Sequence, residues 1–214
     1  DPPAVTPAPE EPELSPEEIA EQEQLAVERV REEKRQALLD SMTLEEKIGQ
    51  LFFVRCPADN AVEDISTYHL GGYLLFSRDY KDDDNWLTRD QFTQKMQSYQ
   101  DAAAIPLFIG SDEEGGTVTR ASRNPNLFSE KFKSPQTIYS TGGMEALAQD
   151  ALNKSQALLD LGINVNFAPV CDVSADPNDF IYDRTLGQDA ETTAEYVTRT
   201  VLTMGDTGEM AVLK

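Results

Sequence analysis

The sequence predicts an α/β fold in which buried parallel strands alternate with helices. Short apolar runs flanked by Gly, Pro or Asp recur between residues 51 and 213, and such runs are typical of strands covered on both faces. Segments with helical spacing and helix-end signals separate the runs. Repeated strand–helix–strand order implies a parallel sheet with right-handed crossovers.

Five apolar runs are the expected strands, at 51–54, 72–76, 106–109, 165–170 and 210–213. The helices between them are expected at 60–70, 88–104, 143–161 and 189–204. The 88–104 helix opens with a capping box formed by Thr88 and Gln91. The last two helices are expected to stop at Gly162 and Gly205, because glycine commonly follows a helix end.

The first forty residues differ in composition from the rest. Half of the 12 prolines fall within residues 1–16, and proline without glycine favours an extended chain, so we expect 1–14 to be a disordered, acidic, Pro-rich linker. Ser15-Pro16-Glu17-Glu18 combines a cap, a first-turn proline and a capping box, which predicts a charged helix over 15–40. A second capping box over Thr43–Glu46 opens a short helix at the start of the folded region, 41–214.

Charge and residue usage exclude several classes of function. The formal net charge of −21 disfavours binding to nucleic acids or anionic membrane surfaces, and no apolar run approaches the roughly 20 residues of a membrane span. Two cysteines without a CxxC pattern, and a single histidine, predict neither a disulfide scaffold nor a metal site, and no cofactor is expected. Cys56 and Cys171 fall on strands that are not neighbours, which predicts free thiols.

Polar residues follow four of the apolar runs: Arg55, Ser77–Asp79, Ser111–Glu114 and Cys171–Asp172. Polar residues gathered at the C-terminal ends of strands are typical of a (β/α)8 barrel, whose active sites are built there. We therefore expect 41–214 to form a partial TIM-type barrel with about five of the eight strands. The absence of a GxGxxG segment after the first strand disfavours a dinucleotide-binding sheet.

The clearest candidate site is the segment Phe108–Arg120, where three consecutive acids end a buried strand. Gly115-Gly116 allows a tight turn or close approach of a ligand to the backbone. The Asp112 carboxylate and the Arg120 guanidinium together suit a polyol, since the carboxylate accepts hydrogen bonds from hydroxyl groups and the guanidinium donates hydrogen bonds to oxygens. The alternative interpretation is a solvated acidic loop.

Asp112-Glu-Glu-Gly-Gly-Thr-Val-Thr-Arg120 resembles the D-x-E-G-G-x-V-x-R segment of family 3 glycoside hydrolases, in their β-N-acetylhexosaminidase branch. Further segments resemble that family in the same order along the chain: 42–51, 70–76, 166–173 and 183–187. The resemblance covers about residues 41–214. It implies a TIM-type barrel that releases terminal β-linked N-acetylglucosamine with retention, from peptidoglycan- or chitin-derived substrates.

The resemblance also implies roles for single residues. The expected substrate-binding residues are Asp112, Arg120, Arg184 and Lys214. Glu114 is expected to orient its loop, and Asp172 to be structural. Lys214 matches the lysine that opens the family's K-H-F-P-G-H-G motif, and the family's acid/base and nucleophile lie beyond that point. No catalytic residue is therefore expected within 1–214, and this chain alone is expected to be inactive.

Two other classes of function remain open on the sequence. One is a non-catalytic saccharide-binding or scaffold half-barrel. The other is an aldolase-type barrel, for which Lys214 is the one lysine at an expected strand end. The leader predicts export, with the protein secreted or held at the cell surface by a preceding membrane anchor; the alternative is a cytoplasmic protein. The expected partner is a saccharide, and the oligomeric state stays open.

Three residues or segments outside the site have simpler interpretations. His69 is expected to cap or pack a helix end. Asp82–Asn85 lacks the glycine and distant glutamate of an EF-hand loop and predicts a solvated loop. Trp86 is expected to pack within the fold rather than to stack on a sugar.

Overall fold

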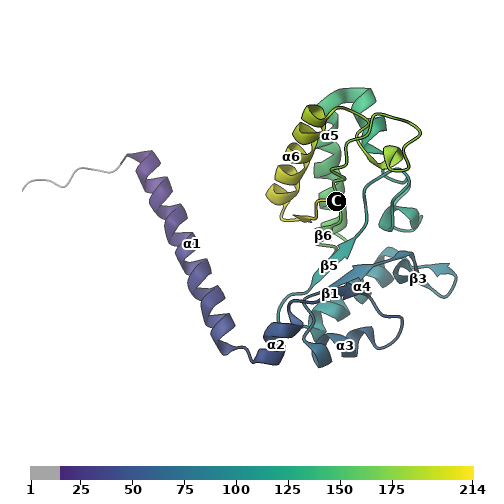
Figure 1. The fold of residues 1–214 in the computed structure, drawn as a ribbon. Coiled ribbons are helices and arrows are strands. Elements are labelled where there is room, and N and C mark those ends of the chain that lie inside the picture. Colours follow the sequence, from purple (N-terminus) through teal and green to yellow (C-terminus); the bar gives the residue numbers. More distant parts are fainter. Residues whose placement is uncertain (1–14) are drawn as a thin grey trace, which may run out of the picture. The chain divides into compact units, whose positions relative to one another are not determined.

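A computed structural model describes residues 15–214, and Figure 1 shows its fold. The expected linker over 1–14 lies outside the described residues. By its internal contacts the chain divides into two units, residues 1–43 and residues 44–214. The candidate site lies in the second unit.

The first unit contains one long helix, α1 (Pro16–Ser41). The predicted capping box is confirmed: the Glu18 N–H donates to Ser15 Oγ, and the Ser15 N–H donates to the Glu18 carboxylate at 2.8 Å. No residue of α1 is buried, and its apolar stripe stays exposed. Its stability therefore rests on capping and on side-chain pairs along the helix, such as Arg35 with Glu32.

The second unit is built on five parallel strands, whose bounds are β1 (Phe53–Arg55), β2 (Gly72–Leu75), β5 (Phe108–Ser111), β6 (Val165–Asn166) and β7 (Met210–Ala211). They pair in the order β1-β2-β5-β6-β7, and every pair is parallel (Figure 1). The predicted parallel sheet in sequence order is confirmed, as part of an α/β barrel architecture. Because all strands run the same way, their C-terminal ends share one edge of the sheet.

All five strands have bounds that differ from those predicted: the first and third begin two residues later, and the second, fourth and fifth end earlier. The first strand begins at Phe53 rather than residue 51, because Leu51 and Phe52 belong to the turn that leaves the preceding helix, where their N–H groups bond back to Ile48 and Gly49. The fourth is only two residues long and ends at Asn166 rather than at residue 170.

The helices of this unit are α2 (Leu44–Gly49), α3 (Ala61–Tyr68), α4 (Arg89–Ala102), α5 (Pro135–Leu159) and α6 (Ala190–Thr207). The capping box before α4 is confirmed. α5 begins eight residues before the predicted start at 143, after the cap Ser134, and it is kinked at Gly142–Gly143. α6 runs through Gly205 and ends at Gly208, whose φ of 90° is the left-handed conformation that ends helices; the predicted stop at Gly205 is wrong.

The segment predicted as a solvated loop is a small hairpin. β3 (Lys81–Asp82) pairs antiparallel with β4 (Asn85–Trp86). The hairpin lies between the 3-10 turn η1 (Ser77–Tyr80) and α4. Lys81 Nζ lies 4.6 Å from the centre of the Trp86 ring, and Trp86 packs against the core as predicted. Two further 3-10 turns are η2 (Ala121–Arg123) and η3 (Tyr182–Arg184).

The buried apolar core combines side chains of the sheet with side chains of the helices that pack on it. The larger buried cluster includes Tyr73, Leu75, Ile109 and Leu158. On the sheet itself, the rings of Phe53 and Phe167 stack at 5.4 Å, and a Cβ on Gly110 would lie within 3 Å of both rings. The absence of a side chain at Gly110 therefore makes room for this aromatic pair.

Several smaller predictions also concern this unit. His69 caps α3, since its N–H donates to the Ile65 carbonyl. Cys56 and Cys171 are free thiols, as predicted. Within residues 15–214, no helix combines the length and apolar character that crossing a membrane would demand.

Candidate sugar-binding site

The three acids that follow β5 are buried. Asp112, Glu113 and Glu114 are 7%, 0% and 3% exposed, so the interpretation as a solvated acidic loop is wrong. Asn166 of β6 holds this segment through two hydrogen bonds: the Glu113 N–H donates to its Oδ1 at 3.0 Å, and its Nδ2 donates to the Glu113 carbonyl at 3.2 Å. The neighbouring strand thus fixes the backbone on which the acids stand.

Glu113 organises the loop that returns to the site. Its Oε2 accepts the N–H groups of Arg120 and Ala121 at 2.9 and 2.8 Å, and its Oε1 accepts the Ser122 hydroxyl. Burial raises the pKa of Glu113, and these hydrogen bonds oppose the rise. The loop-orienting role expected of Glu114 therefore belongs to its neighbour.

Glu114 instead forms ion pairs with two cationic side chains. Arg184, at the end of η3, forms a bidentate pair with its carboxylate, with Nε and Nη2 at 2.9 and 2.8 Å from the two oxygens. Lys214 Nζ lies 2.8 Å from Glu114 Oε1. The hydrogen bond to Glu114 raises the pKa of Arg184 above its usual value.

Asp112 completes the arrangement. Its Oδ1 accepts from Lys214 Nζ, and its Oδ2 lies 3.5 Å from Arg120 Nη2. The Arg120 guanidinium also lies 5.7 Å from the centre of the Phe76 ring. The structure therefore brings all four predicted residues together with Glu114. We call these five residues, Asp112, Glu114, Arg120, Arg184 and Lys214, the ionic cluster.

The parallel sheet explains why the cluster forms. Asp112 and Glu114 follow β5 directly, and Lys214 follows β7, so their backbones leave the sheet at the same edge. Two backbone bonds hold the last residue: the Lys214 N–H donates to the Pro169 carbonyl at 3.2 Å, and the Cys171 N–H donates to the Lys214 carbonyl at 2.7 Å. Asp172 is exposed and acts on Arg184 only through space.

Sequence reasoning missed Glu114 as a member of the cluster, although a signal was present. Residues two apart in an extended segment point to the same face, so Glu114 lies on the side of Asp112 and Glu113 on the opposite side. Two carboxylates and three cations at one sheet edge provide hydrogen-bond acceptors beside donors, which suits a ligand rich in hydroxyl groups. Among residues 15–214, no three His, Cys, Asp or Glu side chains are grouped to hold a metal ion.

A parallel α/β sheet with such a cluster at its C-terminal edge defines a barrel-type domain with a polar site. Residues 43–214 match the family described as the glycosyl hydrolase family 3 N terminal domain. This match covers well over half of the chain, and the chain therefore belongs to that family.

Individual relatives carry hexosaminidase names. Beta-hexosaminidase LpqI of Mycobacterium tuberculosis is 29% identical over 171 residues, which are 79% of this chain and 42% of that protein. Beta-hexosaminidase A of Pseudoalteromonas piscicida is 36% identical over 118 residues, 54% of this chain and 19% of that protein. The solved family 3 beta-N-acetylglucosaminidase of a Paenibacillus species is 29% identical with a TM-score of 0.68, over 81% of this chain and 33% of that one. The chain thus spans less than half the length of these relatives.

Proposed function

We propose that the natural full-length protein is a β-N-acetylhexosaminidase that releases terminal β-linked N-acetylglucosamine with retention of configuration. The observation that carries the proposal is the ionic cluster, with its two buried carboxylates, at the C-terminal edge of the sheet in a chain that belongs to family 3. The names of the relatives support the reaction class. Peptidoglycan fragments and chitin fragments are the two substrate sources that fit a terminal N-acetylglucosamine.

In this proposal the ionic cluster binds the sugar and takes no part in breaking the glycosidic bond. Asp112 accepts hydrogen bonds from sugar hydroxyls, while Arg120, Arg184 and Lys214 donate hydrogen bonds to sugar oxygens. Both carboxylates are already engaged by cations, within hydrogen-bond distance or, for Asp112 and Arg120, at 3.5 Å. A retaining hydrolase also needs a nucleophile and an acid/base flanking one bond. We propose that these two groups come from residues that follow Lys214 in the natural protein.

Hydrolysis of a chromogenic aryl β-N-acetylglucosaminide tests this proposal, with the full-length protein compared with 1–214. We expect turnover by the full-length protein and none by 1–214. In the full-length protein, Asp112→Ala should lower kcat/KM at least about 100-fold, which corresponds to about 2.7 kcal/mol of lost transition-state binding. The matched control Asp101→Ala removes an exposed carboxylate of α4 and should leave kcat/KM unchanged.

Three results would count against the proposal. No hydrolysis by the full-length protein would refute the activity, and the α-anomer as first product, seen by NMR, would refute retention. Turnover by 1–214 that disappears in Asp112→Ala would place the catalytic centre within this chain.

We also propose that the protein is exported, with the acidic, Pro-rich leader acting as a spacer. Its composition supports an extended chain rather than a packed one. Cell fractionation of the native organism tests the proposed export. An exported protein should be recovered from the medium or from the envelope fraction. Recovery only with cytoplasmic marker proteins would overturn it.

A further inference from the structure

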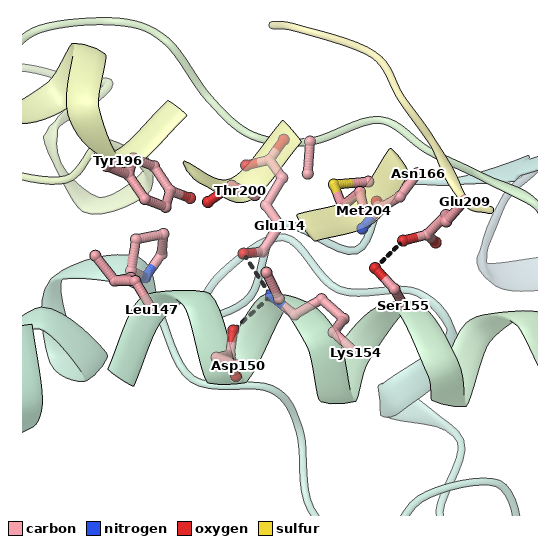
Figure 2. A pocket seen from close by; sticks show the side chains of 13 residues that line it. Glu114, Leu147, Asp150, Lys154, Ser155, Asn166, Tyr196, Thr200, Met204 and Glu209 are labelled. Atoms are coloured by element: carbon pink, nitrogen blue, oxygen red, sulfur yellow. Dashed lines mark hydrogen bonds and ion pairs between the residues drawn. The ribbon is translucent and has the colours of Figure 1, made fainter. Parts of the chain in front are cut away.

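Two adjacent polar residues of α5, Lys154 and Ser155, are buried, at 9% and 0% exposed. A buried ammonium or hydroxyl group destabilises a fold unless it is bonded. Both groups are bonded, and their partners lie on the two chain segments that lead to the ionic cluster (Figure 2).

Lys154 contacts the segment that follows β5. Its Nζ lies 3.4 Å from the backbone carbonyl oxygen of Glu114 and 3.1 Å from Asp150 Oδ2, one turn earlier on α5. The same ammonium lies 5.3 Å from the centre of the Phe132 ring. Phe132 is itself bonded to the glycine turn, because its carbonyl accepts the Gly116 N–H at 2.9 Å. Lys154 therefore holds the backbone of the residue whose side chain binds Arg184 and Lys214.

Ser155 contacts the segment that leads into β7. Its hydroxyl donates to Glu209 Oε2 at 2.6 Å, and Glu209 immediately precedes β7. From there the strand follows β6: the Met210 and Val212 N–H groups each donate at 2.9 Å to carbonyls of Asn164 and Asn166. This ladder leads directly to Lys214, so Ser155 anchors the start of the segment that ends in the cluster.

Both contacts border one small cavity of about 20 Å³ that Glu114, Lys154, Ser155, Thr200 and Glu209 help to line (Figure 2). A cavity of that size admits about one water molecule. At most about one ordered water molecule could therefore take the place of a side chain that is shortened here.

We propose that Lys154 and Ser155 are positioning residues for the ionic cluster: α5 holds the Glu114 backbone with one and the start of the Lys214 segment with the other. The expected effect on affinity for N-acetylglucosamine rests on the proposed function. The positioning role goes beyond that function, because it assigns the geometry of the site to a helix that does not contact the sugar. Loss of either contact lets the Glu114 carboxylate and the Lys214 ammonium separate.

The test uses the full-length protein and the variants Lys154→Met and Ser155→Ala. Two exposed positions give matched controls: Lys131→Met in the loop before α5, and Gln156→Ala on α5 itself. The first readout is the dissociation constant for N-acetylglucosamine, from NMR titration well below the melting temperature of each variant. The second readout is independent of sugar: the NMR signal of the Lys214 ammonium, assigned with Lys214→Arg.

We expect Lys154→Met to weaken sugar binding about tenfold or more, the size of loss typical when a supporting partner of a site residue is removed. Its Lys214 signal should move towards the position seen in Glu114→Gln, and the controls should leave both readouts at wild-type values. If Lys154→Met does not fold, Ser155→Ala, the smaller change, carries the same two measurements.

A folded Lys154→Met or Ser155→Ala protein with wild-type affinity and an unmoved Lys214 signal would overturn the proposal, even if its melting temperature fell. That result would assign both residues to stability alone. Failure of the wild-type protein to bind the sugar would instead refute the proposed function, and the Lys214 signal would still decide the positioning role.

Discussion

At the scale of single residues, the pair formed by Glu114 and Arg184 is the best-defined part of the site. The Glu114 side chain is almost completely buried and that of Arg184 is one-quarter exposed. A bidentate carboxylate–guanidinium pair fixes both groups in one plane. Removing one partner of a buried pair costs more than the pair contributes, because the other charge is left without compensation.

Arg184→Met should therefore destabilise the protein by about 3 kcal/mol. Lys214 remains beside Glu114 but does not replace two parallel hydrogen bonds. Urea unfolding measures this difference, with Arg199→Met as control because the ion pairs of Arg199 lie on the surface and contribute less than about 1 kcal/mol. Equal losses in the two variants would contradict the importance of the pair.

A second prediction at this scale concerns Glu209. Burial raises the pKa of Glu209 from 4.5 to about 7, while the Ser155 hydroxyl and the Lys154 charge oppose the rise. The folded protein thus binds this proton more tightly than the unfolded chain. The stabilising contribution of the proton is complete below about pH 4.5 and is lost as pH rises through 7.

Glu209→Gln should remove this dependence, because an amide does not titrate in this range. Relative to the variant, the wild-type protein should lose up to about 3 kcal/mol of unfolding free energy between pH 4.5 and pH 8. Denaturant unfolding across that range measures it, and Glu145→Gln on the exposed surface serves as control. If the unfolding free energies of wild type and Glu209→Gln change with pH in parallel, the pKa of Glu209 is not raised in the folded protein.

At the scale of elements, the sheet was predictable because buried parallel strands produce continuous apolar runs and their connections produce caps and periodic helices. Thr88 and Gln91 mark the start of α4 in the sequence and in the structure. Local signals failed where tertiary contacts decide. A Cβ added at Gly205 would meet nothing within 4 Å, so this position lies in an open part of α6, while Gly208 takes the left-handed conformation that ends the helix.

In the candidate site, too, local signals predicted some residues, and tertiary contacts decided the others. Strand-end position indicated Asp112 and Lys214, since parallel strands bring their C-terminal ends together. The buried contacts of Lys154, Ser155 and Glu209 were not predictable, because they depend on how α5 packs against the segments before β7 and after β5, and no periodic pattern encodes that packing. In the sequence, polar residues within a helix such as Lys154 and Ser155 predict an exposed helix face.

Gly110 gives a prediction for the sheet. A methyl group there would lie 2.6 Å from Phe53 Cζ and 2.9 Å from Phe167 Cε2, so Gly110→Ala should destabilise the protein by about 1–3 kcal/mol through overpacking. Phe53→Leu in the same chain should recover part of that loss by clearing the space. The control Gly205→Ala should stabilise by about 0.5–1 kcal/mol, because it removes a glycine from an open helix interior. Chemical denaturation would compare the four proteins, and a stabilised Gly110→Ala would contradict the packing described.

At the scale of the whole molecule, the two units have different sources of stability. The unit over 44–214 has a buried core, whereas α1 buries none of its residues. An amphipathic stripe without burial contributes little to cooperative unfolding. The charged helix and the domain should therefore respond separately to heat or denaturant.

Removal of residues 1–43 should leave the denaturation midpoint of the remainder unchanged and should lower the helical circular dichroism signal. The measurement compares the near-ultraviolet signal, which reports the packed aromatic residues, with the far-ultraviolet signal, which reports all helices. A fall in the near-ultraviolet midpoint after truncation would contradict the separate sources of stability of the two units.

The two free thiols differ in a way that matters for studying this protein. Burial raises the pKa of Cys56, which keeps its sulfur protonated and slow to react. Cys171 is partly exposed, and its backbone is hydrogen-bonded to Lys214. A maleimide fluorophore should therefore attach selectively beside the ionic cluster without any engineered cysteine, and a change in its emission on addition of N-acetylglucosamine would test the proposed sugar binding.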